Sequence, residues 1–131
     1  MMPSMAVELN HHIVHARDPE ASARFMTEIL GLPAPTTFGP FIVVQAANGV
    51  SLDFIGTDDD RYLVPNHYAF LVSDAEFDTI LGRIKARGLD YFADPAGKQK
   101  GQINHHFGGR GVYWADPDGH WLEIITRPNV P

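Results

Sequence analysis

The sequence contains no cysteine, so neither a disulfide framework nor a thiolate metal site is available to it. Any metal ligands must therefore come from histidine, aspartate, glutamate or water. A chain without disulfides is typical of a reducing compartment, and we expect the protein to be cytoplasmic.

Basic residues and long hydrophobic runs are also scarce. Lysine and arginine number 10 against 16 acidic residues, and the net charge is -6 with histidine neutral. Because binding to nucleic acid requires a basic face, we expect no nucleic-acid partner. No apolar run approaches the ~20 residues that cross a bilayer, so no membrane association is expected. A chain of 131 residues with 44% apolar residues is predicted to form one domain, over residues 1–131.

An internal repeat is the most informative feature of the chain. His11 is followed seven positions later by Asp18. His67 is followed at the same spacing by Asp74, and each residue of this second pair lies 56 positions after its counterpart. A stretch with helical spacing follows in each half and is predicted to end at a glycine. The chain is therefore predicted to contain two copies of one unit.

Strand and turn signals divide each copy further. Apolar stretches flank a turn at Asn48-Gly49 in the first half and a turn at 116–119 in the second. Each copy is thus predicted to be a β-α-β-β-β unit. The predicted fold class is α+β, with two tandem units that form a curved mixed sheet and helices on its outer face. The predicted segments are a first module at about 7–56, a linker at 57–65 and a second module at about 66–127.

Four side chains occupy equivalent positions in the two copies. The motif Gly-x-x-Leu-acid ends at Asp53 in the first half and at Glu123 in the second, while His11 and His67 begin equivalent strands. Strands send alternate side chains to opposite faces. If the two units pair into one curved sheet, these four side chains converge on its inner face. Two imidazoles and one carboxylate can bind a first-row divalent ion and leave positions open for a substrate.

Other histidines fit such a site less well. His15 shares a strand face with His11, but four residues of strand separate them by ~13 Å, which is too far for one ion. The alternation of side chains turns His12 and His120 to the opposite faces of their strands. We expect these three histidines to be hydrogen-bonded scaffold residues.

Several stretches of the chain resemble the vicinal oxygen chelate superfamily. They are residues 9–11 with 17–25, residues 66–70 and residues 116–123. This superfamily includes glyoxalase I, fosfomycin-resistance transferases, extradiol dioxygenases and bleomycin-resistance proteins, and the resemblance covers nearly the whole chain. It implies that His11, His67 and Glu123 hold one divalent ion, and the ligand types leave Fe, Mn, Zn, Ni and Co open. It also implies a homodimer, with each site formed either within one chain or across two.

Five further residues are candidates for the chemistry. Asp53 matches a position that is glutamate in glyoxalase I, and it is a candidate fourth ligand or base. The second copy holds 14 more residues than the first, in a glycine-rich connection at about 96–111. Arg110 and His105 of this connection, together with Tyr113 and Trp121, are predicted to contact the substrate.

The resemblance implies a metal-dependent enzyme that acts on a small molecule by chelation of neighbouring substrate oxygens. A lyase, an isomerase, a thiol transferase and a ring-cleaving dioxygenase all fit this description. The alternative is a metal-free small-molecule binding protein of the bleomycin-resistance type.

Overall fold

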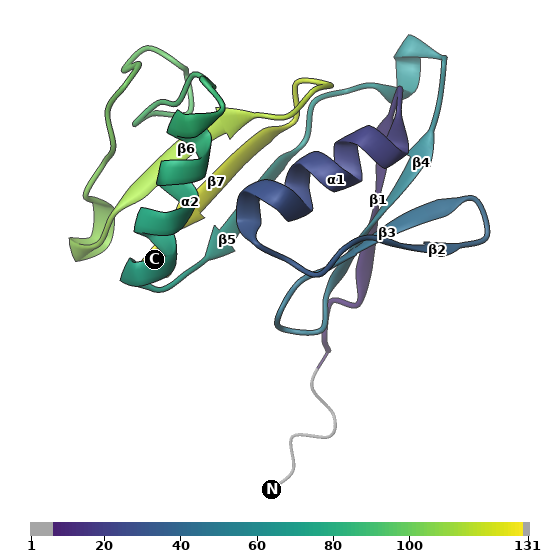
Figure 1. Ribbon diagram of the computed structural model, residues 1–131, viewed down its shortest axis with the longest axis horizontal. Coiled ribbons are helices and arrows are strands. Elements are labelled where there is room, and N and C mark those ends of the chain that lie inside the picture. The colour runs from purple at the N-terminus through teal and green to yellow at the C-terminus, as the bar shows by residue number, and fades with distance from the viewer. Residues whose placement is uncertain (1–6, 130–131) are drawn as a thin grey trace, which may run out of the picture.

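The computed structural model describes residues 7–129, which form two modules, each a small sheet with one helix on it (Figure 1). The first module contains β1 (His11–Ala16), α1 (Pro19–Leu30), β2 (Thr36–Phe38), β3 (Phe41–Gln45) and β4 (Ser51–Gly56). The second contains β5 (His67–Leu71), α2 (Asp74–Ala86), β6 (Gly111–Ala115) and β7 (Trp121–Ile125). Two short 3-10 helices lie in the connections, η2 (Asp60–Tyr62) and η3 (His106–Gly108). The predicted α+β class is confirmed.

The two sheets share one pairing scheme. The strand order is β1-β4-β3-β2 in the first sheet and β5-β7-β6 in the second. The first strand of each module pairs in parallel with the last, β1 with β4 and β5 with β7. In place of a fourth strand the second module has an isolated bridge between Phe92 and Tyr113. Over residues 7–129 the two modules form separate sheets. β1 and β5 do not pair with each other, and each is an edge strand of its own sheet.

Local signals in the sequence set the helix ends. The side chain of Asp18 accepts a hydrogen bond from the backbone N–H of Ala21 (3.1 Å), and Pro19 occupies the first turn of α1. Gly31 ends this helix in the left-handed conformation, with φ of 73°, which costs glycine little. Ser73 and Glu76 form a capping box at the start of α2.

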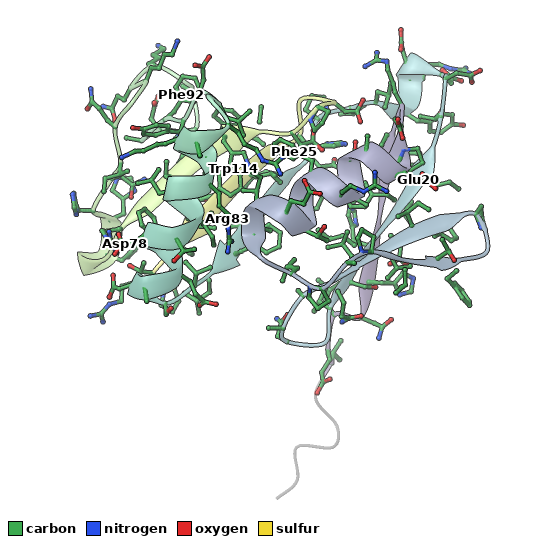
Figure 2. The ribbon with its side chains drawn as sticks, in the orientation of Figure 1. Glu20, Phe25, Asp78, Arg83, Phe92 and Trp114 are labelled. Carbon is green, nitrogen blue, oxygen red and sulfur yellow. The ribbon has the colours of Figure 1, made fainter. Side chains whose placement is uncertain are left out.

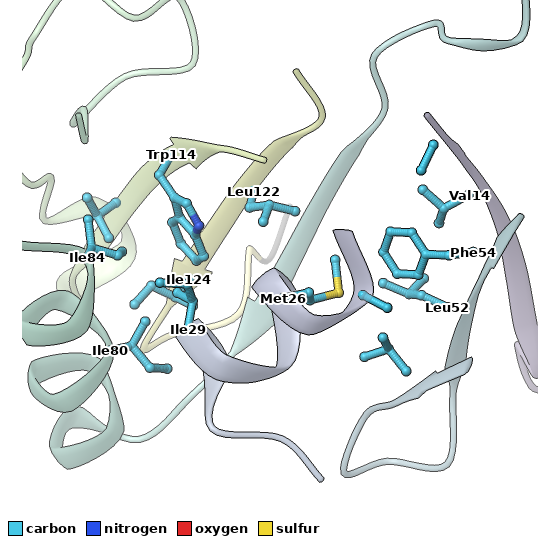
Figure 3. Close-up of a cluster of buried hydrophobic side chains, with 14 of the residues drawn as sticks. Val14, Met26, Ile29, Leu52, Phe54, Ile80, Ile84, Trp114, Leu122 and Ile124 are labelled. Carbon is cyan, nitrogen blue, oxygen red and sulfur yellow. The ribbon is translucent and has the colours of Figure 1, made fainter. Parts of the chain in front are cut away.

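One hydrophobic core lies between the helices and the strand faces that they cover (Figure 3). Phe54 of the first sheet and Trp114 of the second are both fully buried in it. Arg83 of α2 lies between the two helices (Figure 2), where its Nη1 donates to the backbone carbonyl of Ile29 in α1 (3.0 Å). No helix among residues 7–129 has the length and apolar character needed to cross a membrane.

Among residues 7–129 no helix lies on the opposite face of either sheet, and we call it the helix-free face. Strand alternation and the pairing register determine which side chains belong to it. In the first module they are His11, Ile13, His15, Thr36, Phe38, Phe41, Val43, Gln45, Ser51, Asp53 and Ile55. In the second module they are His67, Ala69, Leu71, Gly111, Tyr113, Ala115, Trp121, Glu123 and Ile125. All eight predicted site residues except Arg110 and His105 belong to this face.

The turn between β6 and β7 ties the second module to the first. Asp118, whose side chain is only 4% exposed, accepts hydrogen bonds from the backbone N–H of Arg17 (3.3 Å) and from Ser22 Oγ (3.1 Å). His120 is buried nearby, and its Nε2 donates to the backbone carbonyl of His15 (2.9 Å). These contacts join segments about a hundred residues apart in the chain, so both side chains have a scaffold role.

Replacement of Asp118 by alanine is expected to lower the free energy of unfolding by about 2 kcal/mol, because a buried charged acceptor is lost and its donors remain. Urea unfolding of the metal-free protein measures this change. Asp60→Ala is the matched control, since Asp60 also pairs with Arg17 (3.1 Å) but is 85% exposed, and surface pairs contribute little. Equal destabilisation by the two variants would contradict the scaffold role of Asp118.

Candidate metal centre

The ladder between β5 and β7 brings two of the predicted ligands together. His67 pairs with Trp121, and Ala69 pairs with Glu123, so the side chains of His67 and Glu123 lie on one face of adjacent strands. His67 Nε2 lies 3.1 Å from Glu123 Oε1. This pair is called the half-site below.

The backbone fixes which nitrogen of His67 faces Glu123. His67 Nδ1 lies 2.9 Å from the carbonyl oxygen of Trp121. Because a carbonyl only accepts, Nδ1 carries the hydrogen, and the lone pair of the neutral ring is on Nε2. That lone pair faces a carboxylate oxygen, which is also an acceptor. A cation between them, either a proton or a metal ion, satisfies both, and a metal ligand held by a backbone carbonyl is a common arrangement for histidine.

In the described part of the chain, Glu123 is a buried carboxylate without a lysine or arginine paired to it, as is typical of a metal ligand. Its side chain is only 6% exposed. Among residues 7–129 no lysine or arginine pairs with it, and His67 is its one ion-pair partner. A buried carboxylate without a counter-charge is costly, and coordination to a divalent ion removes that cost. The residues present therefore fit a metal ion.

Tyr113 lies beside the half-site. It pairs with Glu123 in the β6–β7 ladder, and its ring stacks on that of His67 with centroids 5.9 Å apart. Burial, together with the nearby charge of Glu123, raises the pKa of Tyr113 to about 12. The hydroxyl therefore stays protonated over the physiological range and remains a donor.

His11 does not reach the half-site within one chain. It is exposed, and its Nδ1 lies 2.8 Å from the side-chain oxygen of Asn10. Over the part of the chain that the structure describes, no three histidine or acidic side chains gather around one point. A single chain thus brings together two of the three predicted ligands.

Asp53 occupies the middle of the helix-free face of the first module. It pairs with Ile13 on one side and Val43 on the other, and it accepts a hydrogen bond from Ser51 Oγ (2.8 Å). It is thus equivalent in the sheet to Glu123, but in this chain it is separate from the half-site.

Comparison with known proteins identifies the family. Residues 8–124 match the family described as the Glyoxalase/Bleomycin resistance protein/Dioxygenase superfamily. The chain belongs to this superfamily.

Two solved structures are similar to this chain over nearly their whole length. Oxidase ChaP-H1 is 64% identical with a TM-score of 0.91, covering 94% of this chain and 98% of its own. Oxidase ChaP-H2 is 56% identical, also with a TM-score of 0.91, covering 95% of this chain and 96% of its own. Glutathione transferase FosA from Serratia marcescens is 27% identical over 127 residues, 92% of this chain and 81% of its own.

Arg110 lies on the opposite side of the sheet from the half-site of this superfamily protein. Arg110 donates to Asp78 of α2 (2.7 Å) and to Asp74 (3.2 Å), and its guanidinium lies over the ring of Phe77 at 4.4 Å. It therefore packs on the helix side of the sheet, where its donors are already engaged. His105 is exposed and precedes η3. Their predicted contact with a substrate stays a prediction.

Trp121 belongs to an aromatic row that leads away from His67. Its ring lies 5.9 Å from that of Tyr113 and 5.5 Å from that of Phe92. Phe92 comes from the connection after α2 (Figure 2) and was not among the predicted site residues. No sequence signal marks it, because it joins the sheet through an isolated bridge rather than a strand.

A groove of about 540 Å³ lies between the modules. Every residue of β5 lines it, and the first module contributes mainly apolar side chains such as Leu9, Leu32 and Leu52. The groove is thus bounded by an edge strand that carries a candidate ligand, and it is large enough for a small molecule.

Proposed function

We propose that the protein is a metal-dependent enzyme that oxidises a small molecule through a pair of neighbouring substrate oxygens. The observation that carries this proposal is the half-site, in which the lone pair of His67 faces the buried carboxylate of Glu123. Oxidation is favoured over lyase or thiol-transfer chemistry by the 64% identity to a protein named an oxidase. A divalent ion bound there supplies Lewis acidity toward the two substrate oxygens.

We infer further that the site is completed across a homodimer, by His11 of the partner subunit. Two features of the chain support this inference. His11 lies on an edge strand, and so does His67, so each has a strand edge open to a second copy. The helix-free face also leaves Ile13 42% exposed and Leu71 61% exposed, and such apolar area favours association.

The composition of the helix-free face supports an uncharged, largely apolar substrate. The positions that define this face in the two sheets contain no lysine and no arginine. A strongly anionic substrate would therefore find no counter-charge on the strands. Apolar side chains such as Phe41, Val43 and Ile55 surround Asp53, which remains the candidate fourth ligand or base.

A metal-free binding protein is the second candidate function, and the groove between the modules favours it. In that case the half-site would be a hydrogen-bonded histidine–glutamate pair without a metal ion. The groove would then take up apolar ligands whether or not a metal is present.

Metal analysis followed by oxygen uptake tests the proposal. Protein purified without chelator is expected to carry about one first-row metal ion per chain, and, loaded with iron, manganese or cobalt, to consume dioxygen with catechol or 1,2-dihydroxynaphthalene as probe. Removal of the metal with a chelator is expected to abolish uptake, and restoring the metal to recover it. Protein that binds these diols equally well with and without metal, and consumes no oxygen, would support the binding protein instead.

A further inference from the structure

Tyr113 is largely enclosed by its neighbours in the second module. It is 8% exposed, although it lies on the face of the sheet that no helix covers. Its ring lies against those of His67 and Trp121, at 5.9 Å in both cases and with interplanar angles of 29° and 18°. Near-parallel contacts of this kind hold ring orientation as well as contributing buried area.

Tyr113 is also the neighbour of the half-site carboxylate across the β6–β7 ladder. The β6–β7 register places Tyr113 directly opposite Glu123, and cross-strand neighbours of this kind have their Cβ atoms about 5 Å apart. The hydroxyl is a donor, and Glu123 is a buried acceptor with no lysine or arginine paired to it in residues 7–129. The raised pKa of Tyr113 is consistent with this proximity.

The half-site is thus supported from three directions within one module. The carbonyl of Trp121 holds Nδ1 of His67, the ring of Tyr113 packs on the imidazole, and Tyr113 lies directly opposite Glu123 in the β6–β7 ladder. All three supports come from β6 and β7, whose register is set by the ladder.

We propose that Tyr113 is a positioning residue, whose ring orients His67 and whose hydroxyl orients Glu123. Both metal ligands of the half-site then have their binding orientation before the third ligand is added. This inference rests on the proposed function, because its measurable consequence is the affinity of the site for metal. It assigns Tyr113 an action through the ligands rather than on the substrate.

Replacement of Tyr113 by phenylalanine is expected to weaken metal affinity about tenfold to a hundredfold, as loss of a partner that orients a ligand does. Competition with a coloured chelator measures the affinity, with cobalt as the probe metal. The absorption bands of bound cobalt report ligand geometry and are expected to shift. Tyr68→Phe is the matched control, because the Tyr68 hydroxyl accepts a hydrogen bond from Asn66 Nδ2 (3.0 Å) and its ring packs against the core on the helix side of the same sheet. This control is expected to leave the affinity and the bands unchanged.

A double-mutant cycle in metal-free protein separates this inference from the proposed function. If Tyr113 holds Glu123, Tyr113→Phe is expected to raise the equilibrium constant for unfolding about tenfold in the native protein. In the Glu123→Gln background the same substitution is expected to raise it much less. A coupling between the two substitutions in the free energy of unfolding, together with weakened cobalt binding by Tyr113→Phe, supports the positioning role. Coupling in a protein that binds no metal supports the Tyr113–Glu123 contact and refutes the proposed function. An additive cycle, or cobalt affinity and bands unchanged in Tyr113→Phe, overturns the positioning role.

Discussion

Replacement of His67 by alanine is expected to remove the bound metal almost completely. The half-site supplies two ligands from one chain, and loss of either leaves no pair of donors on adjacent strands. Removing a partner that only orients a ligand costs tenfold to a hundredfold in affinity, so loss of the ligand itself is expected to exceed about a hundredfold. Metal analysis of protein purified without chelator measures the effect.

The variant needs two checks, because it also leaves Glu123 buried without a partner. Circular dichroism should show that His67→Ala keeps the native secondary structure. His106→Ala is the control for general histidine effects, since His106 is exposed on η3. Full metal content in a folded His67→Ala protein would remove the basis of the proposed function.

Mixing two inactive variants is expected to restore metal binding if each site is shared between chains. His11→Ala lacks the ligand on β1, and His67→Ala lacks the ligand on β5, so neither homodimer has an intact site. In a mixed dimer one of the two sites receives His11 from one chain and an undamaged half-site from the other. Random pairing then leaves about a quarter of all sites intact. Oxygen uptake by the coexpressed variants should rise to about that fraction of the native value.

Comparing the mixture with the separate variants distinguishes a site shared between two chains from a site formed within one chain. If His11 and His67 of the same chain formed the site, every site in the mixture would lack one ligand. Activity of the mixture would then equal that of the separate variants. Mixing His67→Ala with Glu123→Ala is the matched control, because both changes damage the half-site and every pairing leaves each site one ligand short.

Much of the architecture could be predicted because it follows from local chemistry and from the repeat. Asp18 and Gly31 mark the ends of α1, and Ser73 with Glu76 marks the start of α2. The 56-residue offset places His67 on a strand equivalent to that of His11, and the structure has both at the first position of a strand. These features depend on a few neighbouring residues, which a sequence displays directly.

The partners of Arg110 could not be predicted in the same way. Its position in a glycine-rich connection near β6 suggested contact with a substrate. The structure places Asp74 and Asp78 within reach of its guanidinium, because α2 packs on the side of the sheet to which Arg110 points. Such a contact between distant segments depends on how the helix lies across the sheet, which composition and spacing do not reveal.

The sequence by itself determined the two repeated units, their strand and helix order, and the residue types at equivalent positions, because periodicity, caps and turns are local properties. Only the tertiary structure decided which of those positions meet. His67 and Glu123 come together because β5 and β7 pair in parallel in one register, whereas His11 lies in a different sheet, on an edge strand that pairs with no further strand among residues 7–129. Pairing of strand edges is a long-range choice, and it is made by packing and hydrogen bonding between segments that the sequence keeps far apart.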